Sequence, residues 1–282
     1  MRLLVIGGIA LDYLCKVKDV DSKVTQVLQY SENLGGMAYN TAFAAAQLGV
    51  GTTLVSAVGK DFPKQPRTKN LAYALTKTSG QTTRSFLFYD GRDERICFFR
   101  GAYHDMDVKR AKAEIKKADW AHFAGVAPCF SELARFAAKE GKVMSCNLGY
   151  DLFHYPAEDR LISDLLSSSD YIITNSKELD YLGRQPEDLA KKATIVTMGK
   201  DGSRIFSNTG EIRVPAFNTN VKSPFGAGDA YTGTLIAALL NGKNLKKSAY
   251  LASAAGSFTV EEKSTTPKLS WVKLERRAAT LG

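Results

Sequence analysis

Short apolar runs rich in β-branched and aromatic residues alternate with helix-period segments along most of the chain. Each run has the length of one strand, and together they are Arg2 to Ile6, Gly51 to Val58, Trp120 to Phe123, Lys142 to Asn147, Tyr171 to Thr174 and Thr194 to Thr197. Helices are predicted between them, for example over Tyr39 to Leu48 and Ser131 to Glu140. Apolar strands separated by such helices are typical of a parallel sheet that is covered on both faces. The pattern therefore predicts an α/β fold with a doubly wound, mostly parallel sheet and helices on both faces.

Two segments depart from this alternation and predict a small separate β-sheet. Residues 12–34 and residues 84–103 have the character of antiparallel strands. We expect them to pair into one β lid over the carboxyl ends of the main strands, where open α/β sheets bind their ligands. The chain is accordingly expected to form a single domain over residues 1–282 with a discontinuous lid, and a hairpin over residues 203–214. The stretch 62–82 gives no clear helix.

Composition narrows the class of protein. With 44% hydrophobic and 24% charged residues, the chain has an ordinary globular balance. No apolar run approaches the ~20 residues of a membrane span, and the first strand continues into Asp12 without a signal-peptide cleavage site. Four widely spaced cysteines and three isolated histidines fit neither a disulfide framework nor a zinc site. We expect a cytoplasmic protein with no membrane partner.

The net charge of +9 raises the question of nucleic-acid binding. The lysines and arginines are dispersed along the chain, so most of them are expected on solvated helix faces, and no nucleic-acid partner is expected. A positive field also attracts nucleotides. Charge alone therefore leaves the function open.

The segment Ser223 to Asp229 contains two glycines and leads directly into an apolar helix expected over Ala230 to Leu240. Backbone amides at a helix N-terminus can hold a phosphoryl group, and glycine lets the backbone approach it closely. We expect Gly226, Ala227 and Gly228 to form an anion hole, with Asp229 beside it as the base that accepts the proton of an attacking hydroxyl. Taken alone, Asp229 is also a reasonable helix cap.

A second glycine motif, Gly35-Gly36, also opens a helix, and the two motifs together resemble the signatures of the PfkB/ribokinase family of carbohydrate and nucleoside kinases. The resemblance spans nearly the whole chain. In family order it includes Asp12, Gly35, Gly36, Asn40, Gly59, Asp61, Asn175, Glu178, Thr197 to Gly202 and Gly226 to Asp229. It implies a ribokinase-like fold and an ATP-dependent phosphotransferase in which Asp12, Gly35, Gly36 and Asn40 bind the hydroxyls of the acceptor and Asp229 is the base.

The same resemblance implies a nucleotide site and a magnesium ion. Asn175, Thr197, Gly199, Lys200 and Gly202 would lie beside ATP, and Glu178 would hold Mg²⁺ through water. Magnesium keeps most of its waters and uses one or two carboxylates, so a single glutamate is chemically adequate. The spacing of Asn175 and Glu178 also matches a capping box, and the loop from Thr197 to Gly202 also matches a plain turn. Ser223 and Thr234 depart from the family pattern, which argues against activation by a monovalent cation.

The acceptor is left open between a nucleoside and a sugar or sugar phosphate. Aromatic residues in the second lid segment can stack on a nucleobase, or they can pack the lid onto the main domain or onto a partner as a homodimer. Segments around Cys97 to Ala102 and Asp119 to Phe123 are similar to archaeal broad-specificity nucleoside kinases, so we expect a nucleoside phosphorylated on its primary hydroxyl. Arg100 would bind the acceptor, and a guanidinium there also suits a sugar phosphate. A non-catalytic nucleotide-binding protein is a further alternative.

Overall fold

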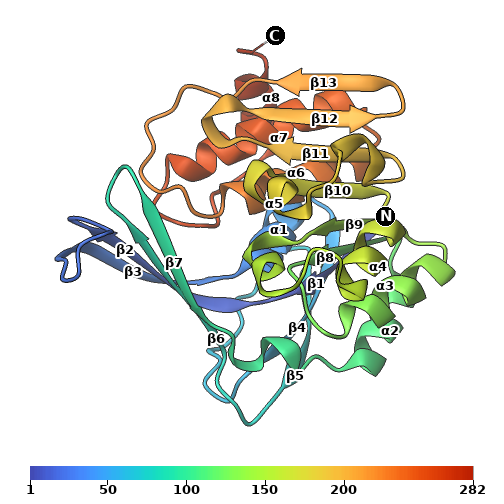
Figure 1. Cartoon of the computed structure of the whole chain (residues 1–282), viewed down its shortest axis with the longest axis horizontal. Helices are drawn as coiled ribbons and strands as arrows, with labels where there is room; N and C mark the ends of the chain where they lie inside the picture. The colour runs from blue at the N-terminus through green and yellow to red at the C-terminus, as the bar shows by residue number, and fades with distance from the viewer. Residues whose placement is uncertain (282) are drawn as a thin grey trace.

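The computed structural model describes residues 1–281, and in this part of the chain it contains one nine-stranded and one four-stranded sheet (Figure 1). In spatial order the large sheet consists of β13 (Gly210–Val214), β12 (Ser203–Ser207), β11 (Ala193–Thr197), β10 (Tyr171–Asn175), β9 (Val143–Asn147), β8 (Trp120–Ala124), β1 (Arg2–Gly7), β4 (Gly51–Val58) and β5 (Leu71–Lys77). From β11 to β5 all neighbouring strands run parallel. Strand β12 runs antiparallel to both of its neighbours, β11 and β13. The predicted mostly parallel sheet is confirmed.

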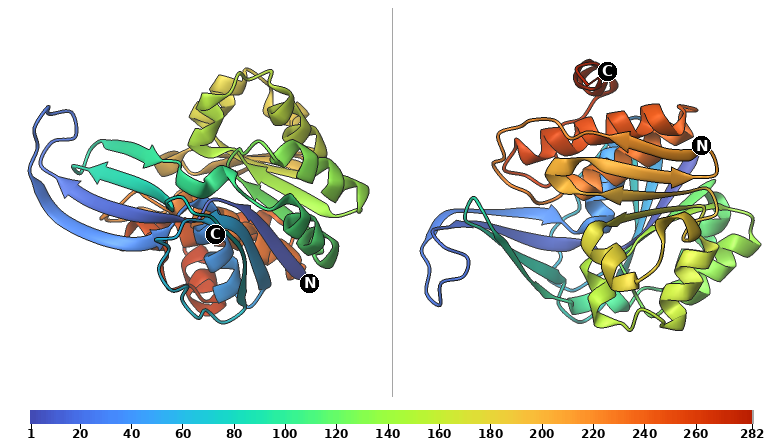
Figure 2. Two further views of the ribbon diagram at one scale, coloured as in Figure 1. Left: turned by 90° about the horizontal axis from the view of Figure 1, so that it is seen from below. Right: turned by 45° about the horizontal axis from the view of Figure 1, so that its top comes forward.

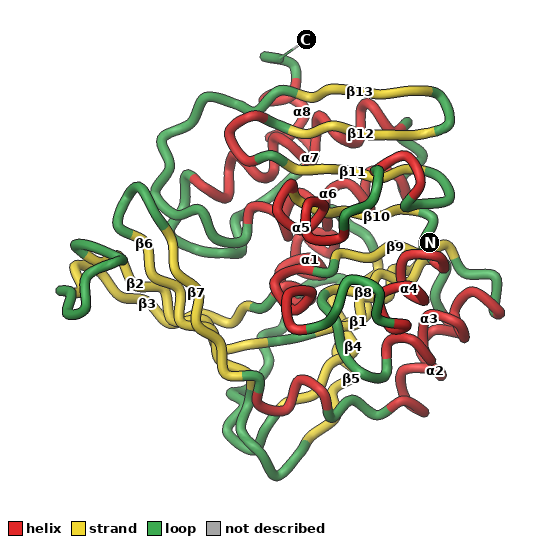
Figure 3. Tube along the Cα trace, in the orientation of Figure 1, coloured by secondary structure: helices red, strands yellow, loops and turns green. Residues whose placement is uncertain are grey.

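Helices cover both faces of this sheet (Figures 2 and 3). One layer contains α1 (Met37–Gln47), α6 (Ala227–Leu240), α7 (Leu245–Val260) and α8 (Trp271–Ala278), and the other contains α2 (Val108–Lys117), α3 (Phe130–Lys139) and α4 (Arg160–Ser168). A shorter helix, α5 (Ser176–Leu182), follows β10. None of the helices within residues 1–281 combines the length and apolar character that a bilayer crossing requires.

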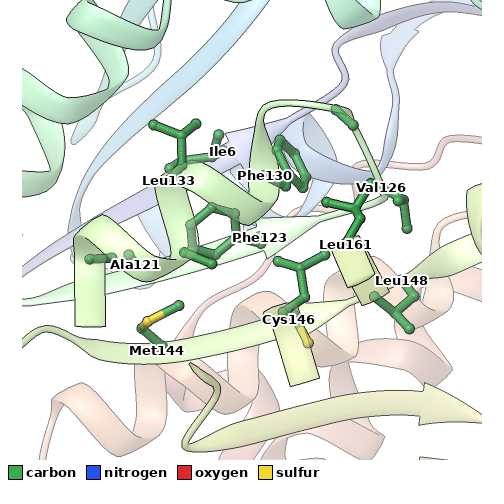
Figure 4. Packing of buried hydrophobic residues seen from close by; sticks show 14 of the residues in the cluster. Ile6, Ala121, Phe123, Val126, Phe130, Leu133, Met144, Cys146, Leu148 and Leu161 are labelled. Carbon is green, nitrogen blue, oxygen red and sulfur yellow. The ribbon is translucent and has the colours of Figure 1, made fainter. Parts of the chain in front are cut away.

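Strand β1 shows how the sequence pattern builds the two-sided core. Its side chains alternate between faces, so Leu3 and Val5 pack among the residues of α1, α6 and α7. Leu4 and Ile6 pack on the other side with α2, α3 and α4. Figure 4 shows this second cluster, in which Phe123 and Phe130 meet edge to face with ring centroids 5.3 Å apart. A strand with buried residues on both faces must be continuously apolar, as the sequence is here.

The small sheet, which we call the lid, has the order β3 (Val27–Gly35), β2 (Ala10–Val17), β6 (Thr83–Tyr89) and β7 (Glu94–Phe99). Each of the two expected segments supplies one antiparallel pair, but the segments join through β2 and β6, which run parallel. The second segment ends earlier than expected, because residues 101–104 form a 3₁₀ turn, η1 (Gly101–His104). Tyr103 therefore belongs to the buried core beside the lid and not to a lid strand.

Two further details differ from the sequence prediction. Residues 71–77, in the stretch that gave no clear helix, form the edge strand β5. Only Leu71 and Leu75 of this strand are buried, and its two alanines are a weak strand signal. The connection from β4 to β5 contains no helix in this described stretch. Helix α6 begins at Ala227, three residues before the expected start, so Asp229 lies inside its first turn.

Candidate active site

A cavity of about 350 Å³ lies between the inner face of the lid and the carboxyl ends of the main strands. The terminal residues of four neighbouring parallel strands line it, namely Ala124 of β8, Asn147 of β9, Asn175 of β10 and Thr197 of β11. The lid contributes Asp12, Ser85, Leu87, Ile96 and Phe98. Its size falls within the range of small-molecule sites, and its position is where open α/β sheets bind ligands.

Asp229 lies at the wall of this cavity, in the first turn of α6. Its Oδ2 accepts a 2.8 Å hydrogen bond from Nδ2 of Asn40. Removal from water raises the pKa of Asp229 to about 7, and the negative charges of Asp12 and Glu178 act in the same direction, while the Asn40 hydrogen bond opposes them. A carboxylate with a pKa near neutrality is suited to act as a general base, because it can both take up and release a proton.

Asp12 faces the same cavity from β2, and only 3% of the residue is exposed. Its Oδ2 accepts a hydrogen bond from the amide of Gly36 at 3.3 Å, and burial raises its pKa to about 7. Within residues 1–281, Oδ1 of Asp12 and Oδ1 of Asn40 have no hydrogen-bond partner. Buried oxygens without a donor are rare in proteins. Two of them on the cavity wall are suited to bind hydroxyl donors of a ligand.

The two glycines of the first motif are required for different steric reasons. A Cβ on Gly35 would lie 1.8 Å from Oδ2 of Asp12, so any side chain there would displace the carboxylate. Gly36 has φ of 88° and caps α1, and a Cβ on it would approach the carbonyl oxygen of Gly8 to 2.8 Å. Gly35 therefore supports the cavity from behind, whereas Gly36 itself lines it.

The second motif begins α6 as expected. Gly226 is its N-cap with φ of 82°, and a Cβ there would lie 2.7 Å from the carbonyl oxygen of Thr265. Gly228 has open space around its Cα and lines the cavity, as does Gly226, whereas Ala227 is not part of the wall. The first amides of a helix have no intrahelical acceptor. Those of Ala227 and Gly228 are thus available to an anion at the cavity edge.

Asn175 and Glu178 form a complete capping box at the start of α5. Oδ1 of Asn175 accepts from the amide of Glu178 at 3.0 Å, and Oε2 of Glu178 accepts from the amide of Asn175 at 3.4 Å. The hydroxyl of Thr174 also donates to Oε2 at 3.0 Å. The capping interpretation is therefore confirmed, and the capped Glu178 also lines the cavity, where burial raises its pKa to about 7.

Of the remaining sequence candidates, only Thr197 belongs to the cavity wall within residues 1–281. Gly199 and Lys200 are exposed in the turn after β11, whose last residue, Thr197, does line the cavity. Position 202 requires glycine for packing, since a Cβ there would lie 2.1 Å from the carbonyl oxygen of Val214. Arg100 is not brought to the wall. Its guanidinium lies 5.8 Å from the centroid of the Phe98 ring.

Sequence reasoning missed a group of residues that the fold adds to the cavity. They are Ser85, Glu94, Asn147, Tyr150, Asp151 and Thr265. The sequence contains one indication of Asn147 and Asp151: Asn147 ends a predicted parallel strand and Asp151 follows it, at the carboxyl end where ligands bind. The complete wall now holds five carboxylates, from Asp12, Glu94, Asp151, Glu178 and Asp229, and no lysine or arginine of residues 1–281.

The chain is similar in sequence and in fold to known kinases. A nucleoside kinase of Methanocaldococcus jannaschii is 28% identical, over 98% of this chain and 96% of that protein. The crystal structure of M. jannaschii nucleoside kinase, an archaeal member of the ribokinase family, superimposes with a TM-score of 0.78 at 25% identity, covering 99% of this chain and 98% of that chain. The structure of Burkholderia thailandensis nucleoside kinase in complex with inosine gives a TM-score of 0.84 at 19% identity, with 99% and 97% coverage. Residues 1–271 match the pfkB family of carbohydrate kinases, and the chain therefore belongs to this family.

Proposed function

We propose that the protein transfers the γ-phosphate of ATP to the primary hydroxyl of a nucleoside ribose. The observation that carries the proposal is the grouping of Asp12, Asn40 and Asp229 on one cavity wall, next to the free amides of the α6 N-terminus. The unpartnered oxygens of Asp12 and Asn40 would accept from the secondary hydroxyls of the ribose. This arrangement would leave the primary hydroxyl facing Asp229.

In this mechanism Asp229 accepts the proton of the attacking hydroxyl as phosphoryl transfer proceeds. The hydrogen bond from Asn40 holds the carboxylate in one orientation. The amides of Ala227 and Gly228 stabilise negative charge on the transferring group, and the helix dipole acts in the same direction. A non-catalytic binding protein would need neither this base nor its raised pKa of about 7.

A magnesium ion fits the residues that line the cavity. Five carboxylates on a wall that contains no lysine or arginine of residues 1–281 would repel the phosphates of ATP, and a divalent ion bound to those phosphates offsets this repulsion. Within residues 1–281 no group of acidic, histidine or cysteine side chains forms a metal cage. Glu178 would therefore hold the ion through water. When bound, Mg²⁺ neutralises phosphate charge.

The charge of the cavity also discriminates between acceptors. A sugar phosphate brings two negative charges, which kinases usually meet with arginine or lysine. The cavity wall offers five carboxylates and, among the described residues, no basic side chain. This favours a neutral acceptor. Of the two neutral classes, the nucleoside has a base that can lie against the partly exposed ring of Phe98, which a free sugar would leave uncovered.

An acceptor screen tests the proposal. Inosine, adenosine, cytidine, ribose, fructose and fructose 6-phosphate are compared at equal concentration by ADP release with Mg²⁺ and ATP. We expect a nucleoside to give the highest kcat/KM, because its base supplies binding energy remote from the reacting atom. A free sugar or a sugar phosphate that outperforms every nucleoside would contradict the acceptor assignment and leave phosphoryl transfer intact.

We also propose that the protein forms a homodimer through the outer face of the lid. Tyr13 stacks there between Phe86 and Tyr30, at centroid distances of 5.1 and 6.4 Å, and Val27 and Leu28 are about half exposed. Apolar patches of this kind mark interaction surfaces. Sedimentation of the parent and of Tyr30→Arg tests this, since a dimer that becomes monomeric supports it and a monomeric parent contradicts it.

We propose a cytoplasmic location as well. The four cysteines are free in residues 1–281, which fits a reducing compartment.

A further inference from the structure

A second polar group lines the cavity and has no part in the proton transfer described above. It consists of Asp151, in the 3₁₀ turn η2 (Gly149–His154) after β9, and Tyr103, in η1. Phe98 of the lid lines the same cavity and packs edge-on against His154 of η2, with ring centroids 5.5 Å apart. The group thus joins an acidic side chain, a phenol and an aromatic ring from three separate elements.

The glycine after β8 makes room for this group. A Cβ on Gly125 would lie 2.3 Å from the hydroxyl of Tyr103 and 2.9 Å from Oδ2 of Asp151. Gly125 also has φ of 93°, a conformation that other residues rarely adopt. Both polar atoms therefore converge on one point above the sheet, and any side chain at position 125 would separate them.

The surroundings of Asp151 raise the pKa of its carboxyl group overall, and several neighbours limit this rise. Burial raises its pKa, whereas the positive charge of Arg100, the amide of Val126 and the hydroxyl of Tyr103 oppose this rise. The guanidinium of Arg100 thus lowers the pKa of Asp151 without lining the cavity. An ionised carboxylate has about four lone-pair positions and no donor. Because Asp151 lines the cavity, a ligand there can use this accepting capacity.

We infer that Asp151 accepts a hydrogen bond from an N–H group on the base of the acceptor nucleoside, and that the enzyme selects nucleosides whose base carries such a donor. The inference rests on the proposed nucleoside function. A base lying against Phe98 would present its edge to Asp151 and Tyr103, while its ribose is bound by Asp12 and Asn40. A base without a donor would exclude water from the carboxylate and give it no hydrogen bond in return, which enzymes discriminate strongly.

Substrate pairs that differ in this donor test the inference in the unmodified enzyme. Inosine is compared with 1-methylinosine, which lacks the ring N–H, and adenosine with purine riboside, which lacks the amino group. We expect kcat/KM to be higher for the donor-bearing member of at least one pair by about 10²-fold. Equal values within both pairs would overturn the inference.

The variant Asp151→Asn tests whether this residue is responsible. Its side chain has the same shape but is uncharged and has an amide group in place of one oxygen, so the N–H of the base loses a charge-assisted acceptor and the ratio within the discriminating pair should fall several-fold. Because the ratio is taken on one preparation, a partial loss of folded enzyme cancels. Asp105→Asn is the matched control, since Asp105 is exposed just after η1 and does not line the cavity. It should preserve the parental ratio.

The outcomes separate the two proposals. Turnover of nucleosides with a ratio that Asp151→Asn leaves unchanged would overturn the role of Asp151 alone. Turnover of ribose without any turnover of nucleosides would overturn the nucleoside function and this inference with it. A purely structural role of Asp151, as a counter-ion of Arg100, predicts lower thermal stability with the parental ratio, and this result also counts against the inference.

Discussion

Asn40 donates a hydrogen bond to Asp229 across 189 positions of sequence. The contact depends on the close packing of α1 against α6. A Cβ on Gly233 of α6 would lie 2.4 Å from the carbonyl oxygen of Thr41 and 2.8 Å from Cβ of Ala44, so only glycine permits this approach. The packing of two helices thus brings an amide from the first motif to the carboxylate of the second, and the site exists only where both helices are in place.

Replacing the base should separate chemistry from binding. We expect Asp229→Asn to lower kcat by at least ~10²-fold, because the neutral amide cannot accept the proton, while nucleotide binding changes little. Steady-state kinetics and nucleotide titration on one preparation measure both quantities. Asp188→Asn, at an exposed position of η3 (Pro186–Asp188), is the control. Retention of more than about half of the parental activity by Asp229→Asn would show that Asp229 is not the base.

The pH dependence of the reaction should report the shifted carboxylate. Asp229 must be deprotonated to act, and its pKa is raised to about 7, so kcat/KM should fall as the pH drops through about 7. The pKa of Asp12 is also raised to about 7, so the acidic limb of the pH profile reflects the titration of both carboxyl groups. Asn40→Ala removes a hydrogen bond that lowers the pKa of Asp229 and should move the limb to higher pH. Asn208→Ala, at an exposed turn position outside the cavity wall, should not. An acidic limb near the ordinary value for aspartate in the parent would contradict this account.

The role of Glu178 can be separated from its capping function, because glutamine also completes a capping box. Glu178→Gln should therefore preserve thermal stability, while the Mg²⁺ concentration for half-maximal activity increases several-fold. Metal titrations of activity, paired with thermal unfolding, measure both effects. Asp180→Asn, exposed on the same helix, serves as the control. Metal titrations that overlay with those of the parent would assign Glu178 to helix capping alone.

Gly35 offers a test of how the acceptor site is supported. In Gly35→Ala the new methyl group would occupy the position of the Asp12 carboxylate, since the two would be 1.8 Å apart. We expect kcat/KM for the acceptor to fall by at least ~10-fold, while the KM for ATP changes little. Gly51→Ala, at the start of β4, has open space around it and is the matched control. Equal loss of acceptor and nucleotide binding in Gly35→Ala would indicate general misfolding.

The sequence by itself was enough to predict the α/β class, the two lid segments and the two glycine motifs, because each depends on local patterns. Continuous apolar strands such as residues 2–6 report burial on both faces, and glycines before a helix report its start. The expected fold and family are confirmed. The edge strand β5 escaped prediction, because a half-exposed, alanine-containing strand has no strong local signature.

Tertiary structure alone decided which of these residues meet. The parallel pairing of β2 with β6 sets Asp12 opposite Ser85, and the carboxyl ends of β9, β10 and β11 bring Asn147, Asn175 and Thr197 to one wall. No local pattern encodes such distant contacts, and the pKa shift of Asp12 arises mainly from the burial that they create. The charge of the cavity, with five carboxylates and no basic residue in the described chain, follows from the same packing.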